Sequence, residues 1–181
     1  MALSVRTLSL LCLALGGGAL AGGAEPSQPL TRTNVLRQIP GVSDVRGFAP
    51  PFFKGATHQI SMRVGSSTTE ILGSLGITDG SRQINSLLLW IEKPQATALQ
   101  KQAMAAVARG LLLRCMVGVS NAQLGGVSAI VRRPWMIRGF QEKVLGQLHI
   151  GWGEGESLQV GPQYVSGLSL LWPGNLSRCE L

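Results

Sequence analysis

The sequence is poor in charge and in the residues that usually perform catalysis. Only 14% of its 181 residues are charged and 5% are aromatic, and it has two histidines and three cysteines. Its 45% hydrophobic content is too high for an intrinsically disordered protein. So few cysteines and histidines leave little material for a metal cluster, and we predict neither a metal nor a cofactor.

No recognisable nucleophile motif is present, since no serine lies in a G-x-S-x-G segment. A nucleophilic hydrolase would need His58 or His149 as its base. His58 falls on the apolar face of an alternating segment, which predicts a buried side chain. His149 alternates with Leu148 and Ile150, which predicts exposure. We therefore expect no catalytic residues, and a hydrolase is the weakest of our three functional hypotheses.

Two glutamates in a glycine-rich segment are the other candidates for chemistry. Residues 151–155, GWGEG, superficially suggest a phosphate loop, but such loops lead into a helix and the next residues predict a strand. Glu154 and Glu156 also lack the alternating Asp and Asn oxygens of a calcium loop. We interpret the segment as a hairpin turn and both glutamates as solubilising.

The N-terminal segment has the pattern of a secretory signal peptide. Arg6 precedes an apolar run over residues 8–15, and glycines and small residues follow. An A-x-A site predicts cleavage after Ala21, with Ala24 as the second choice. An uncleaved anchor and a lipoprotein with a modified Cys12 are the alternatives; the glycine triplet disfavours the first, and the two leucines before Cys12 disfavour the second.

The mature chain is predicted to be exported, to the periplasm or outside the cell. Residues 1–21 are the signal, residues 22–33 a flexible leader, and residues 34–181 a single globular domain. Removal of Arg6 lowers the formal charge from +7 to +6. No later segment has the uninterrupted apolar length of a membrane span.

Two cysteines remain after cleavage, and an oxidising compartment favours their pairing. A Cys115–Cys179 disulfide would close a loop of about 65 residues and stabilise the fold by about 4 kcal/mol. It would also hold a tail that otherwise frays, because Cys179 lies two residues from the end of the sequence. A reactive thiol beside Arg114 is the alternative.

The hydrophobic pattern predicts an α+β fold: a mainly antiparallel sheet, one long helix packed on a face, and short accessory helices. We expect strands at residues 58–64, 83–91, 127–131, 148–152, 157–160 and 164–172. We expect helices at residues 34–38, 67–75, 96–114 and 141–145, the second of them opened by the capping-box sequence STTE. The similar segments 86–90, SLLLW, and 168–172, LSLLW, are interpreted as two central strands.

Two segments combine the residue types of binding surfaces. The first is an arginine-aromatic loop that could clamp phosphates and stack on rings, formed by Arg132, Arg133, Trp135, Arg138 and Phe140. The second is an apolar, proline-stiffened loop that could dock a partner, formed by Phe48, Phe52 and Phe53. In both, the alternative is a loop whose aromatic residues pack into the core.

These features favour an exported, non-enzymatic domain that binds a protein or an anionic polymer of the cell envelope. Extracytoplasmic nucleic-acid binding is the alternative, since the positive charge permits phosphate contacts.

Overall fold

The computed structural model describes residues 31–49, 56–77, 80, 82–133, 140–155, 159–160 and 163–181. One antiparallel sheet has the strand order β1-β2-β3-β4-β9-β6-β5, and β7 and β8 form a separate pair. The strands are β1 (Val42–Phe48), β2 (Thr57–Val64), β3 (Ser67–Ile77), β4 (Ile84–Ile91), β5 (Gln141–Leu145), β6 (Leu148–Gly153), β7 (Gln159–Val160), β8 (Gln163–Tyr164) and β9 (Ser166–Leu171). The helices are α1 (Arg32–Arg37), α2 (Ala98–Cys115), α3 (Asn121–Val131) and the 3-10 turn η2 (Gly174–Leu176).

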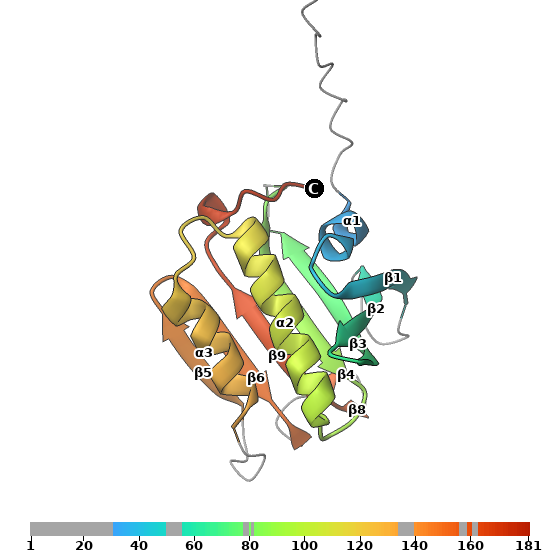
Figure 1. Cartoon of the computed structure of the whole chain (residues 1–181). Coiled ribbons are helices and arrows are strands. Elements are labelled where there is room, and N and C mark those ends of the chain that lie inside the picture. The colour runs from blue at the N-terminus through green and yellow to red at the C-terminus, as the bar shows by residue number, and fades with distance from the viewer. Residues whose placement is uncertain are drawn as a thin grey trace, which may run out of the picture.

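Both long helices cover the same face of the sheet. Figure 1 shows α2 and α3 side by side in front of the strands, with α1 next to β1. The predicted α+β class with a mainly antiparallel sheet is confirmed, and the long helix packs on one face as expected. The difference is α3, a second helix of 11 residues on that face.

The two similar segments are the central strands, as the sequence predicts. β4 pairs with β9 in antiparallel register, so Leu87 lies opposite Leu170 and Leu89 opposite Leu168. All four side chains are buried on the helix-covered face. The core therefore lies between this face and the helices, where apolar burial drives folding.

Helix α2 begins and ends within two residues of its predicted bounds. Thr97 and Gln100 form a complete capping box, which satisfies two backbone donors at the start of the helix. The buried face includes Ala103, Val107 and Leu111. A Cβ at Gly110 would lie 2.4 Å from the Ile39 Cγ2 atom, so this glycine lets the segment after α1 pack directly on α2. Helix α1 begins at Arg32, two residues before its predicted start.

The expected helix over residues 67–75 is wrong, because this segment belongs to β3. Val64 pairs with Ser67 across a two-residue turn, and Gly65 there has a φ of 60° that favours glycine. Ile71 and Leu75 then alternate into the core while the strand bonds to β2 and β4. Pairing on both sides outweighs a local capping preference that a single turn of helix could satisfy.

The expected strand over residues 127–131 is also wrong, because these residues form the second half of α3. A capping box of Ser120 and Gln123 starts this helix, and the Gln123 side chain also donates to the Leu145 carbonyl at 3.0 Å. The S-x-x-Q spacing was therefore the sequence signal that indicated the start of a helix here. Val127 and Val131 are buried in the core, so a β-branched run here reflects burial and not strand.

The expected helix over residues 141–145 is β5, an edge strand. Its partner β6 follows after two residues, and Gly146 in the turn has a φ of 62°. An edge strand exposes polar side chains as a surface helix does, so the polarity of this short segment did not distinguish the two.

Candidate anion-binding surface

The structure describes three residues of the arginine-aromatic loop, Arg132, Arg133 and Phe140. Arg132 follows α3, and the neighbouring Arg133 donates from Nη1 to the Gln141 side chain at 2.9 Å. Phe140 is 49% exposed, and its ring lies over the Cα of Gly151 on the helix-free face of the sheet. The central residues of this predicted site, Trp135 and Arg138, lie outside the described residues.

The apolar loop is described at one residue only. Phe48 is the last residue of β1 and is half-buried. It borders a shallow hollow together with Gln59 and Glu70, whose side chains hydrogen-bond to each other at 2.7 Å. Phe52 and Phe53 lie outside the described residues, so the docking role remains a prediction.

The two histidines occupy the environments that the alternating patterns predict. His58 is 6% exposed, and burial lowers the pKa of its imidazole below its usual value, with the Arg32 charge acting in the same direction. His149 is exposed, and its Nδ1 atom lies 3.5 Å from the Glu142 carboxylate. A hollow of about 470 Å³ beside His149 includes Ser86 and Ser169. Within the described residues neither serine hydrogen-bonds to His149, so no nucleophile-base pair is formed there.

Glu154 is not the exposed, solubilising residue that the glycine-rich sequence predicts. Its side chain is only 6% exposed and its Oε2 atom lies 2.8 Å from Lys101 Nζ on α2. Its other carboxylate oxygen accepts the Ala96 backbone N–H at 3.2 Å. The Lys101 ammonium also lies 5.4 Å from the Trp152 ring centroid. Glu154 therefore joins the end of β6 to the start of α2, and Glu156 lies outside the described residues.

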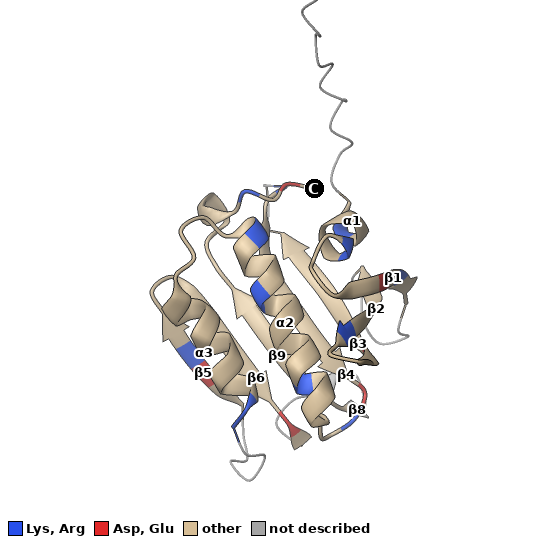
Figure 2. Cartoon of the chain, in the orientation of Figure 1, with Lys and Arg blue, Asp and Glu red and all other residues tan. Residues whose placement is uncertain are grey.

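Carboxylates, but not cations, are separated from the helices of the described chain, since Arg46, Arg63 and Lys143 lie on strands. The α-helices carry only cations, which are Arg32, Arg37, Lys101, Arg109 and Arg114. The described carboxylates lie in strands, loops and the tail, at Asp44, Glu70, Glu92, Glu142, Glu154 and Glu180. Figure 2 shows this separation, with blue segments and no red ones along α1 and α2. Lys101 is neutralised by Glu154, so the arginines supply the net charge of this layer.

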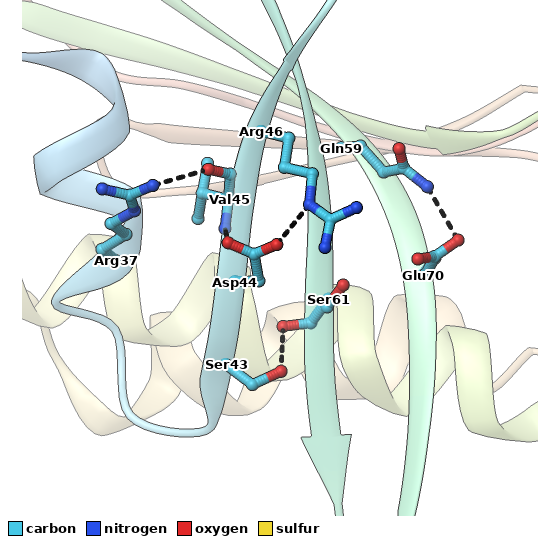
Figure 3. Close-up of polar contacts among 8 residues, drawn as sticks. All are labelled: Arg37, Ser43, Asp44, Val45, Arg46, Gln59, Ser61 and Glu70. Atoms are coloured by element: carbon cyan, nitrogen blue, oxygen red, sulfur yellow. Dashed lines mark hydrogen bonds and ion pairs between the residues drawn. The ribbon is translucent and has the colours of Figure 1, made fainter.

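The carboxylate nearest to α1 is already bound by another arginine. Asp44 and Arg46 both lie on β1, and Figure 3 shows their side chains in contact, with Arg46 Nε 2.5 Å from Asp44 Oδ2. The hydrogen bond from Arg46 is the largest cause of a pKa of Asp44 below its usual value. Arg37 instead donates from Nη2 to the Val45 carbonyl at 3.1 Å, which holds α1 against β1. No side-chain ion pair forms between Arg37 and Asp44, so the guanidinium charge of Arg37 stays exposed to solvent.

At the C-terminal end of α2 the cationic layer contains a hollow of about 530 Å³. The described residues around it come from three segments and are Gln38, Pro40, Gly110, Leu113, Arg114, Arg178 and Cys179. Arg109 lies one residue before Gly110 and is exposed. From the sequence, Arg114 is considered only beside a possible reactive thiol, and neither Arg109 nor Arg178 is predicted as a site residue, although α2 contains no acidic residue and an arginine directly precedes Cys115 and Cys179.

The predicted disulfide is formed between Cys115 and Cys179. No described helix combines the length and apolarity needed to cross a membrane. Among the described residues there is also no group of three His, Cys, Asp or Glu side chains placed to hold a metal. The disulfide is compatible with a protein outside the cytoplasm, where disulfides persist.

Comparison with family models, with curated proteins and with solved structures finds no match to this chain. We therefore infer its function from the chain's own residues.

Proposed function

We propose that this protein is exported to the periplasm or the cell exterior and binds an anionic polymer of the cell envelope, without catalysing a reaction. The signal-like N-terminal sequence and the disulfide support export. The polymer would lie along the cationic layer of α1 and α2, with Arg37 and Arg109 as exposed contacts.

The observation that carries this proposal is the absence of carboxylates from helices that carry arginines. A surface that carries only cations attracts a polyanion, and binding releases the counterions that are condensed on the polyanion. If the arginines were only solubilising, acidic residues would serve equally well and the two signs would be expected to be interspersed.

The helices also contain no aromatic residue. Protein interfaces are enriched in aromatic side chains, and single-stranded nucleic acids are bound by stacking on them. A surface of arginines without aromatic rings instead fits a polymer recognised through its repeated charged groups. This favours the anionic polymer over the protein partner that the sequence left open. Duplex nucleic acid, which also presents a row of phosphates, becomes an outcome of the test.

Binding can be measured by fluorescence anisotropy of the protein with labelled heparin, labelled polyphosphate and a labelled DNA duplex, in salt from 50 to 500 mM. We expect affinity to fall steeply with salt for at least one polyanion. The variant Arg37→Gln/Arg109→Gln should flatten the logarithmic salt slope by about 2 on the DNA duplex, because each phosphate contact contributes about 0.9.

The matched control is Arg63→Gln, which removes an exposed arginine from β2, on the sheet face away from the helices. It should leave the slope unchanged. Equal effects of both variants would contradict the helix surface, and no binding at 50 mM salt would contradict the function. Tightest binding to the DNA duplex would select the nucleic-acid alternative instead. Export is tested separately by N-terminal sequencing, which should find Gly22 or Glu25 as the first residue.

A further inference from the structure

The disulfide places two arginines beside the same hollow. Arg114 directly precedes Cys115 and Arg178 directly precedes Cys179, and the two cysteine Cα atoms are 4.9 Å apart. The Arg178 N–H donates to the Cys115 carbonyl at 2.8 Å, so the two segments are also joined through their backbones. In the sequence these arginines are 64 residues apart, and the cross-link makes them neighbours.

The guanidinium of Arg178 is held at the end of α2. Its Nη2 atom donates to the Leu113 carbonyl at 3.0 Å and to the Met116 carbonyl at 3.3 Å. The Leu113 carbonyl belongs to the last turn of α2 and the Met116 carbonyl to its C-cap residue, and the negative end of the helix would otherwise repel an anion. Arg178 therefore offsets that end and keeps further N–H donors, because a guanidinium has five.

Arg114 also borders the hollow and is only half-buried. Its Nε atom is shielded from solvent and has no hydrogen-bond partner within the described residues. None of the described residues around the hollow is acidic. The nearest carboxylate in the sequence is that of Glu180, which is exposed and does not line the hollow.

We propose that this hollow binds one tetrahedral oxoanion, a phosphate or sulfate group, between the guanidinium groups of Arg114 and Arg178. Planar guanidinium groups bind such oxygens through paired hydrogen bonds, which an ammonium group does not match. The inference deepens the proposed function and rests on it: the hollow binds one charged group of the polymer, while Arg37 and Arg109 contact other parts of the polymer. Because the cross-link holds Arg178 in place, the site is complete only in the oxidised protein.

The test is calorimetric titration of the oxidised protein with pyrophosphate and with sulfate, which separates the two sources of the oxoanion. Arg114→Gln should weaken binding at least tenfold. Arg114→Lys, which retains the charge and loses the planar fork, should recover only part of the affinity. The control Arg63→Gln should stay within twofold of the parent protein. Circular dichroism checks that each variant is folded.

Removal of the cross-link provides a second, independent measurement. Cys115→Ser/Cys179→Ser should weaken pyrophosphate binding to a similar extent in a protein that remains folded. Where this variant unfolds, Arg178→Gln with the disulfide intact replaces it. Parent-like affinity of the cross-link variant would refute the role of the disulfide, and parent-like affinity of Arg178→Gln would refute the role of Arg178.

The outcome is distinguishable from failure of the proposed function. If Arg114→Gln leaves oxoanion binding intact while Arg37→Gln/Arg109→Gln abolishes polymer binding, the hollow is refuted and the polymer surface stands. If pyrophosphate binds through Arg114 and no polymer binds at all, the proposed function is refuted and the hollow is a site for a small anion.

Discussion

The pair formed by Lys101 and Glu154 gives the sharpest test of how the sheet and α2 are joined. The side chains are 16% and 6% exposed, and their charged atoms are 2.8 Å apart. At an effective dielectric constant of about 20, the gross attraction at this distance is about 6 kcal/mol, part of which the desolvation of both groups offsets. We expect Glu154→Gln to lower the free energy of unfolding by about 2–3 kcal/mol, because it leaves the ammonium without its countercharge.

This loss can be measured by urea denaturation followed by tryptophan fluorescence, and by a fall in Tm of about 5–10 °C. Lys101→Met and the double variant complete a thermodynamic cycle, in which we expect a coupling of at least about 1.5 kcal/mol. Glu142→Gln is the matched control, since its partner His149 is 48% exposed and surface pairs contribute little. A loss below about 0.5 kcal/mol, with additive effects in the cycle, would show that Glu154 behaves as a surface residue and would refute this reasoning.

Three further predictions concern stability. Cys115→Ser/Cys179→Ser should cost about 4 kcal/mol in guanidinium denaturation, and an unchanged midpoint would show that backbone hydrogen bonds alone hold the tail. The lowered pKa of His58 means that the imidazole binds a proton more tightly in the unfolded chain, so the free energy of unfolding should fall as pH drops below the ordinary pKa of 6.5. His58→Gln should flatten this pH dependence, and an unaltered pH profile in that variant would contradict the role of His58. Gly110→Ala should destabilise the protein by about 1–3 kcal/mol because its methyl group would overlap a buried side chain. Gly125 is an exposed position of α3 where a Cβ would meet no atom within 4 Å, so Gly125→Ala should stabilise the protein by about 0.5–1 kcal/mol; the same sign for both variants would contradict the packing.

Elements with strong internal patterns were predictable from the sequence. The alternation of His58, Ile60 and Met62 predicts β2, and the apolar stripe of Leu99, Val107 and Leu111 predicts α2. In both cases the period of the pattern matches the period of the element, so burial and local geometry favour the same conformation.

The mispredicted elements have local signals that tertiary contacts override. Ser67 and Glu70 satisfy a capping pattern, yet β3 gains backbone pairing on both of its sides. The valines of α3 favour a strand locally, yet a helix places Val127 and Val131 in the core. Whether each segment forms a helix or a strand depends on the neighbouring elements that it packs against, and the sequence of a single segment does not contain that information.

The candidate site divides in the same way. The sequence alone contains Cys115 and Cys179, the arginine that precedes each of them and the scarcity of carboxylates on the long helix. Once Cys12 is assigned to the signal-like segment, these two cysteines have only each other as an intramolecular partner. The hydrophobic pattern therefore determined the class of fold, and the residue composition determined the cross-link and the sign of the charge.

Only the tertiary structure decided which charged side chains remain exposed for binding and which form contacts that stabilise the fold. Glu154 is withdrawn into a pair with Lys101, and Arg178 is held at the end of α2 beside Arg114, across 64 residues of sequence. Hydrogen bonds and ion pairs act over a few ångströms, so their partners are set by the packing of the sheet against the helices and not by spacing along the chain. The low overall charge of this sequence is thus compatible with two helices, α1 and α2, that carry arginines and no carboxylate, because the described carboxylates lie on other elements.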